Sequence, residues 1–231
     1  MLTVRGLDLH YGNSKILHGV SIEANTGQIT AVMGTNGVGK TSLIKALSGM
    51  HNRTTGDIFL DGEAIGILPS HVLARKGIAV VPQGREIFPL LTVQENLEIG
   101  FSCLPNHNRT IKDEIFELFP ILKEMQSRRG GDLSGGQQQQ LAIGRALVTQ
   151  PKLLLMDEPT EGIQPNIIRQ IGKVIEYLRS NGDMAIILVE QYFEFAYTLA
   201  DSFVVLQRGR VTKNGSKTEV PKNELLAAVS V

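Results

Sequence analysis

Eight residues, Gly34 to Thr41, constrain the fold of this 231-residue chain more than any other part of its sequence. They read Gly-Thr-Asn-Gly-Val-Gly-Lys-Thr, so two glycines with four residues between them, Gly34 and Gly39, are followed by a lysine and a hydroxyl residue. Alternating apolar residues, Ile29, Ala31 and Met33, precede them, and apolar residues at helical spacing follow from Leu43. A strand thus enters a glycine-rich turn that opens into a helix, which is the setting that a phosphate-binding loop (P-loop) requires.

The composition of this loop indicates how it would hold a polyphosphate. Its glycines let backbone N–H groups point inward, and the following helix adds the positive end of its dipole. Lys40 would place an ammonium on the terminal phosphates, and the Thr41 hydroxyl would complete the shell of a Mg²⁺ ion. The alternative is a glycine-rich turn followed by a surface lysine. We predict nucleotide-binding residues here at Gly34, Asn36, Gly37, Gly39, Lys40, Thr41 and Ser42.

Two acidic residues end a second apolar segment. Lys152 to Met156 leads directly into Asp157 and Glu158. Two carboxylates at the tip of a buried strand repel each other unless a cation or a positioned water uses them. We predict that Asp157 binds Mg²⁺ and that Glu158 polarises an attacking water, because no acceptor site for phosphoryl transfer is evident. The alternative for Glu158 is a solvated loop carboxylate.

The periodicity of the apolar residues predicts one α/β domain over residues 1–231. Apolar segments 152–156 and 184–189 flank a helix that begins at Pro165, and strand, helix, strand implies parallel pairing with a right-handed crossover. Residues 89–149 have a mostly helical pattern, interrupted at Pro120. We therefore expect an α/β core formed by residues 1–88 and 150–231, with a helical subdomain inserted at 89–149.

Composition narrows the function. The 23 basic and 23 acidic residues cancel, whereas a nucleic-acid-binding protein normally carries a basic surplus. We expect no nucleic-acid partner. The apolar runs are far shorter than the ~20 residues that span a bilayer. The chain opens without a signal-like segment, and Cys103 has no disulfide partner, so the cytosol is the expected compartment.

A third motif carries a family resemblance. Leu133-Ser-Gly-Gly-Gln137 lies between the P-loop and the Asp157 strand, and it resembles the signature sequence of ATP-binding cassette (ABC) ATPases. Tyr11 stands where that family has its adenine-stacking aromatic residue, and Gln83 where it has a glutamine that senses metal and water. The resemblance implies ATP and Mg²⁺ as cofactors, with Thr41, Gln83 and Asp157 at the metal. It also implies a P-loop NTPase (RecA-like) core with an N-terminal antiparallel β subdomain and an inserted α-helical subdomain.

The signature segment implies a dimer. Ser134, Gly135 and Gly136 offer a hydroxyl and bare backbone N–H groups at a helix start, which makes a second anion receptor. In the family this receptor, here Ser134 to Gln137, faces the γ-phosphate held by a partner's P-loop. The resemblance therefore implies ATP-dependent pairing, either as a homodimer or with a second ABC ATPase. The alternative is that Ser134 only caps a helix.

Two positions depart from the family pattern. Gln164 stands where the family usually has an Asp that contacts the opposite site, so communication between sites is expected to differ. Gln191 stands where it usually has a His. An amide can hold a γ-phosphate but cannot accept a proton, so Gln191 and Glu158 are the predicted catalytic pair, with Glu158 as the base. We expect no histidine-like inflection in turnover near pH 6 to 7.

Other segments resemble importer ATPases of the branched-chain amino acid and urea type. These are Glu190-Gln191, the stretch Gly84-Arg-Glu-Ile-Phe-Pro89 and a very short C-terminus. Residues 130–144 and 158–165 are more similar to the urea branch. The resemblance implies ATP-driven uptake of a small polar solute, urea or a short-chain amide, through two membrane permeases supplied by a periplasmic solute-binding protein. The chain would lie peripherally at the cytoplasmic face of the inner membrane.

Several alternatives stay open at this point. The solute could be a branched-chain amino acid. A cassette ATPase acting on DNA or ribosomes would be expected to carry coiled-coil arms, tandem cassettes or basic linkers, and a small-molecule kinase an arginine-bearing lid. An inactive scaffold is conceivable from Gln164 and Gln191. The apolar residues expected to receive the permease, unless they are buried under the helical insertion, are Ile87, Phe88, Leu90 and Leu91.

Overall fold

The centre of the molecule is a six-stranded sheet, seen in a computed structural model that describes residues 1–105 and 108–229. Its strand order is β10-β9-β3-β8-β7-β6, and only β10 runs antiparallel to its neighbour. The strands are β3 (Ile29–Met33), β6 (Ile78–Val81), β7 (Leu153–Asp157), β8 (Ala185–Glu190), β9 (Ser202–Gln207) and β10 (Arg210–Ser216). Every residue of β3, β7 and β8 is buried, as expected for parallel strands that are covered on both faces.

A second, antiparallel sheet covers one face of the first. Its order is β2-β1-β4-β5, from β1 (Leu2–Tyr11), β2 (Ser14–Ala24), β4 (Thr55–Leu60) and β5 (Glu63–Ile65). Buried residues alternate with more exposed ones along much of β1 and β2, so one side of this sheet packs inward. A core that includes Val4, Leu17 and Ile44 joins it to α1 (Lys40–Leu47) and the central sheet, and α2 (Ser70–Arg75) lies at its margin.

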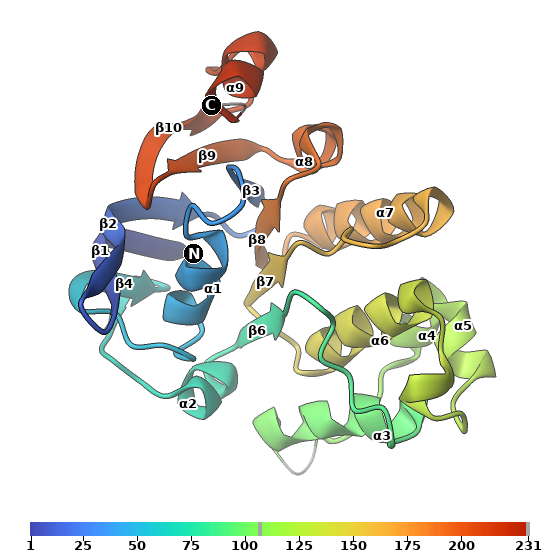
Figure 1. The fold of residues 1–231 in the computed structure, drawn as a ribbon. Helices are drawn as coiled ribbons and strands as arrows, with labels where there is room; N and C mark the ends of the chain where they lie inside the picture. Colours follow the sequence, from blue (N-terminus) through green and yellow to red (C-terminus); the bar gives the residue numbers. More distant parts are fainter. Residues whose placement is uncertain (106–107, 230–231) are drawn as a thin grey trace.

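Helices cover the other face and form the insertion (Figure 1). Between β6 and β7 lie α3 (Val93–Glu98), η1 (Ile99–Cys103), α4 (Asp113–Leu118), α5 (Pro120–Glu124), η3 (Gly130–Asp132) and α6 (Gly135–Val148). Buried Phe119 separates α4 from α5 just before Pro120, where the sequence predicts an interruption. The apolar core of these helices is continuous with the central sheet through α6.

The remaining helices are α7 (Pro165–Asn181), α8 (Phe193–Leu199) and α9 (Lys222–Val229). The predicted strand–helix–strand unit is β7, α7 and β8, and β7 pairs in parallel with β8. The expected architecture, an α/β core with an antiparallel β subdomain and a helical insertion, is confirmed. No helix within residues 1–105 and 108–229 is long and apolar enough to span a membrane.

The strand register positions the site. Met33 pairs with Glu190 across β3 and β8, and Asp157 pairs with Val189 across β7 and β8. The segments that follow these three strands therefore leave the same edge of the sheet, where open α/β sheets bind their ligands.

Candidate functional site

The P-loop lies at this edge and encloses a cavity of about 450 Å³. A Cβ atom on Gly34 would lie 2.3 Å from the Leu206 carbonyl oxygen, and one on Gly39 would lie 2.8 Å from the Leu17 side chain. Both glycines also have φ angles that favour glycine, +151° and +106°, so the tight turn depends on them. The cavity is lined by Tyr11, Ile16, Asn36, Gly37, Gly39, Lys40, Thr41, Ser42, Gln83 and Glu158.

Lys40 is the buried cation of the site. Its ammonium donates to the Gly34 carbonyl at 2.9 Å and to the Thr35 carbonyl at 3.0 Å. It also lies 3.4 Å from Glu158 Oε1. Only 4% of its side chain is exposed, so a phosphate entering the cavity would have to replace part of this set of contacts.

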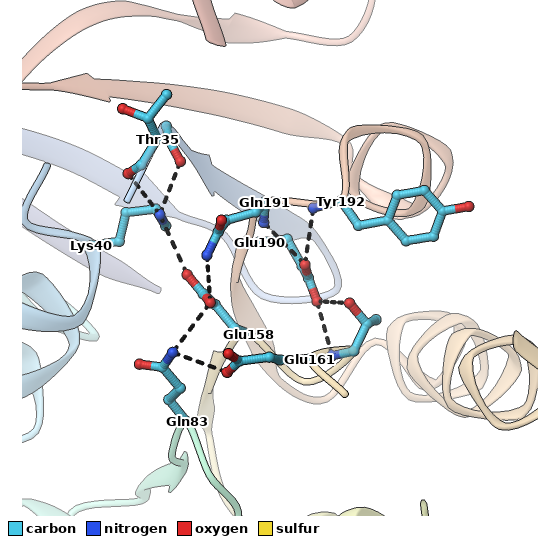
Figure 2. A network of polar contacts seen from close by, with 10 residues as sticks. Thr35, Lys40, Gln83, Glu158, Glu161, Glu190, Gln191 and Tyr192 are labelled. Carbon is cyan, nitrogen blue, oxygen red and sulfur yellow. Dashed lines mark hydrogen bonds and ion pairs between the residues drawn. The ribbon is translucent and has the colours of Figure 1, made fainter. Parts of the chain in front are cut away.

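Glu158 is where the separately predicted residues meet (Figure 2). Gln191 Nε2 donates to Glu158 Oε2 at 2.6 Å, and Gln83 Nε2 donates to the same oxygen at 3.4 Å. The backbone of Glu158 has φ +49°, an uncommon value for a residue with a side chain. Two amides and a lysine thus fix the orientation of the Glu158 carboxylate. Glu158 is therefore not the freely solvated loop residue of the alternative interpretation.

Gln83 also contacts a residue that the sequence did not single out. Its Nε2 donates to Glu161 Oε2 at 3.0 Å, which is shorter than its bond to Glu158. The amide is thus shared between two carboxylates of the segment that follows β7 (Figure 2).

Asp157 has the properties of a metal ligand. Its Oδ1 atom is buried and has no hydrogen-bond partner among the described residues. Burial raises the pKa of Asp157, the Thr41 hydroxyl opposes this shift, and the charge of Glu158 adds to it. Carboxylate and hydroxyl oxygens are the donors that Mg²⁺ prefers. Within the described ranges no group of three or more His, Cys, Asp or Glu side chains is placed to hold a metal ion, so phosphate oxygens would have to complete such a site.

Glu190 is a second residue that sequence reasoning missed as part of the site, although it was noted for its family likeness. Its buried carboxylate accepts hydrogen bonds from the Thr160 backbone N–H at 3.1 Å and from the Thr160 hydroxyl at 2.7 Å. It also accepts from the backbone N–H groups of Gln191 and Tyr192, at 3.0 and 3.2 Å. It therefore ties the segment after β8 to the segment after Glu158 (Figure 2). A buried strand that ends on a carboxylate was the available signal, as it was for Asp157.

Tyr11 lies at the rim of the P-loop cavity with 40% of its surface exposed. It stacks on His51 with ring centroids 4.3 Å apart. His51 Nε2 in turn hydrogen-bonds to the His10 carbonyl oxygen at 2.8 Å. One face of the tyrosine is thus supported from within the chain, and an exposed aromatic surface remains for a flat ligand.

The signature segment lies apart from the P-loop cavity. Ser134, Gly135, Gly136 and Gln137 line a different cavity of about 690 Å³, together with Gly162 and Gln164. Ser134 caps α6: the Gln137 amide donates to its hydroxyl, and Gln137 Oε1 accepts from the Ser134 amide. The two predicted phosphate receptors share no lining residue in one chain.

The four apolar residues expected at a permease surface divide into two pairs. Phe88 is 46% exposed and Leu90 is 79% exposed. Ile87 is partly buried against the helical core, and Leu91 is half-buried. Arg145 stacks over the Phe88 ring at 5.4 Å, so this exposed aromatic side chain is held in place.

Known proteins resemble this chain over most of its length. The sequence profile described as ABC transporter matches residues 17–161. The high-affinity branched-chain amino acid transport ATP-binding protein BraG of Pseudomonas aeruginosa is 46% identical, over 91% of each chain. The probable branched-chain amino acid transport ATP-binding protein LivF of Archaeoglobus fulgidus is 37% identical, over 97% of this chain and 95% of its own.

Solved structures have the same fold. A nucleotide-free ATP-binding cassette from an ABC transporter is 26% identical, with a TM-score of 0.85, over 100% of this chain and 95% of its own. A cassette in its ADP conformation is 28% identical, with a TM-score of 0.83, over 100% and 94%. The similarity thus includes both sheets and the helical insertion.

Proposed function

This chain belongs to the ABC transporter family, and we propose that it is the ATP-hydrolysing subunit of an importer for branched-chain amino acids. It is an ATPase whose activity is coupled to transport. In importers of this family, such cassettes act as dimers with membrane permease subunits. The observation that carries the proposed catalytic role is the convergence of Lys40, Gln191 and Gln83 on Glu158.

The contacts of Glu158 support its role as the base. A carboxylate with one oxygen against an ammonium and the other against two amides is fixed in orientation, and it can accept a proton from a water beside the γ-phosphate. Gln191 can donate to that phosphate or hold Glu158, but it cannot take the proton. When ATP binds, the Lys40 ammonium would exchange its hydrogen bonds to the Gly34 and Thr35 carbonyls for contacts with the terminal phosphates.

We assign Mg²⁺ to the Thr41 and Asp157 oxygens, with Gln83 close by. The unpartnered, buried Oδ1 of Asp157 supports this assignment. When bound, the ion neutralises charge on the phosphate oxygens. Tyr11 would stack on the adenine, with His51 behind it.

The solute assignment follows the relatives. The sequence resemblance favours a urea or short-chain amide importer, whereas the names of the two relatives above favour branched-chain amino acids. The cassette lies away from the transported molecule, so only a transport measurement decides between the two. We place the chain peripherally at the cytoplasmic face of the membrane, paired with itself or with a second ABC ATPase. Phe88 and Leu90 would face two permeases, and a periplasmic solute-binding protein would deliver the solute to those permeases.

The deciding experiment is uptake in host cells that lack this chain. We expect radiolabelled leucine uptake to be lost and restored by the wild-type chain but not by Lys40→Ala or Glu158→Gln, with urea uptake unchanged. Loss of urea uptake with normal leucine uptake would assign the urea branch instead. Purified wild-type protein should release phosphate from ATP without an added acceptor, which a kinase would not do.

A further inference from the structure

The loop that follows Gln83 has an unusual backbone. Gly84, Arg85 and Glu86 have φ angles of +76°, +72° and +45° in succession. Residues with side chains rarely adopt such angles, and they persist only where the surroundings hold them. Here Arg145 of α6 donates to the Arg85 carbonyl oxygen at 3.3 Å, and the Glu86 amide donates to the Gly84 carbonyl at 2.8 Å. These two contacts hold the backbone of the loop, and so fix the direction in which the Arg85 side chain leaves it.

The Arg85 guanidinium lies against the signature segment. A Cβ atom on Gly135, the first residue of α6, would lie 3.1 Å from Arg85 Nη1 and 3.2 Å from Nη2. A Cβ atom on Gly162 would lie 3.6 Å from the same Nη2. The guanidinium therefore lies close to two glycines, Gly135 and Gly162, and both glycines line the cavity of the signature segment.

This guanidinium has no protein partner in the described part of the chain. It donates no hydrogen bond there, and no carboxylate lies within ion-pair distance. Arginine is always charged and offers five donors in a planar fork that matches phosphate oxygens. The start of a helix is itself electropositive, so the charge of Arg85 beside Gly135 is unfavourable until an anion joins them.

We propose that Arg85 binds the γ-phosphate of the nucleotide held by the partner's P-loop, beside the Ser134–Gly136 backbone. The inference rests on the proposed ATP-dependent dimer and adds a charged residue to its second phosphate receptor. Because Arg85 follows Gln83 by two residues, the same loop touches the nucleotide site of its own chain and that of the partner. Binding in one site would thereby bias the position of Gln83 in the other.

The test measures dimerisation in the Glu158→Gln background, in which ATP is bound but not turned over. Analytical ultracentrifugation with Mg²⁺ and ATP gives the dimer dissociation constant. We expect Arg85→Met to raise it about a hundredfold, since each of two symmetric contacts is a charged hydrogen bond that contributes about tenfold. Arg85→Lys, which keeps the charge but loses the fork, should fall between. Lys173→Met, which removes an exposed charge from the cavity that Gly135 and Gly162 line, is the matched control and should change the constant less than about threefold.

A fluorescent ATP analogue, titrated at a protein concentration that keeps the chain monomeric, separates the other outcomes. We expect Arg85→Met to bind it as the wild-type chain does, because the proposed contact is to the partner's nucleotide. Weakened binding to the monomer would overturn the proposal in favour of a structural role within one chain. If Arg85→Met dimerises as tightly as its parent, the role of Arg85 fails while the proposed function stands. If the Glu158→Gln parent does not dimerise with ATP, the ATP-dependent homodimer fails and the role of Arg85 fails with it, whereas loss of leucine uptake still tests the proposed function on its own.

Discussion

At the scale of single residues, Gln191 decides how turnover should depend on pH. Its amide holds Glu158 at 2.6 Å and does not titrate, so we expect kcat of the wild-type chain to be level between about pH 6 and 7.5. Gln191→His should introduce an inflection at or above about pH 6.5, because the neighbouring carboxylate favours the protonated imidazole. Steady-state phosphate release across that range measures it.

The control for this prediction is Gln191→Ala, which removes the amide without adding a titratable group. We expect it to lower kcat and to leave the pH profile level. An inflection near neutral pH in the wild-type chain, lost on replacing a histidine such as His51, would contradict the assignment of Gln191.

Glu190 predicts a pH dependence of stability. Burial raises the pKa of Glu190 above its ordinary 4.5, against the hydrogen bonds from Thr160, Tyr192 and Gln191. The carboxyl group of Glu190 therefore holds its proton more tightly in the folded chain than in the unfolded chain. The resulting stability is complete below the unfolded pKa and is lost as the pH rises through the raised one.

We compare the wild-type chain with Glu190→Gln, which has no proton to release there. The free energy of unfolding of the wild type, relative to that of the variant, should fall as the pH rises above about 4.5 and level off once the carboxylate is ionised. Urea unfolding at several pH values measures the difference. A difference that grows with pH would contradict the prediction.

At the scale of elements, α6 and α3 begin with the same capping box, so the effects of removing each cap can be compared directly. Ser134 and Gln137 form a reciprocal cap at α6, and Thr92 and Glu95 form one at α3. Removing either hydroxyl should cost about 1 kcal/mol of stability. Only Ser134→Ala should also weaken ATP-dependent dimerisation in the Glu158→Gln background, whereas Thr92→Ala should not. Equal effects on dimerisation would show that Ser134 is only a helix cap.

The elements that could be predicted were those with a local pattern. Alternating residues indicated β3, helical spacing indicated α1 and α7, and two continuous apolar runs indicated β7 and β8. The sequence interpretation did not identify β6, which has only four residues, or the hairpin of β9 and β10, although β9 contains a short apolar run like those of β7 and β8. The P-loop residues and Glu158 were found because they are contiguous motifs. Glu161 and Arg85 were missed because the residues beside them in space, Gln83 and Gly135, are brought there only by folding.

At the scale of the whole molecule, one chain holds two halves of different sites. The P-loop cavity and the signature cavity share no lining residue, so a single chain does not present both receptors to one phosphate. Hydrolysis that needs both should require two chains. We therefore predict that the specific ATPase activity of purified wild-type protein rises with protein concentration and reaches a plateau once dimers predominate.

Dilution supplies the contrast for this prediction. Below the dimer dissociation constant the activity per chain should fall in proportion to protein concentration, while binding of a fluorescent ATP analogue per chain stays constant, because Lys40, Thr41 and Tyr11 belong to one chain. Mixing Glu158→Gln into a fixed amount of wild type should also reduce activity, since mixed pairs form at the expense of active ones. Activity per chain that is independent of concentration down to the monomer range would mean that a single chain hydrolyses ATP unaided, and the second receptor would then have no part in the reaction.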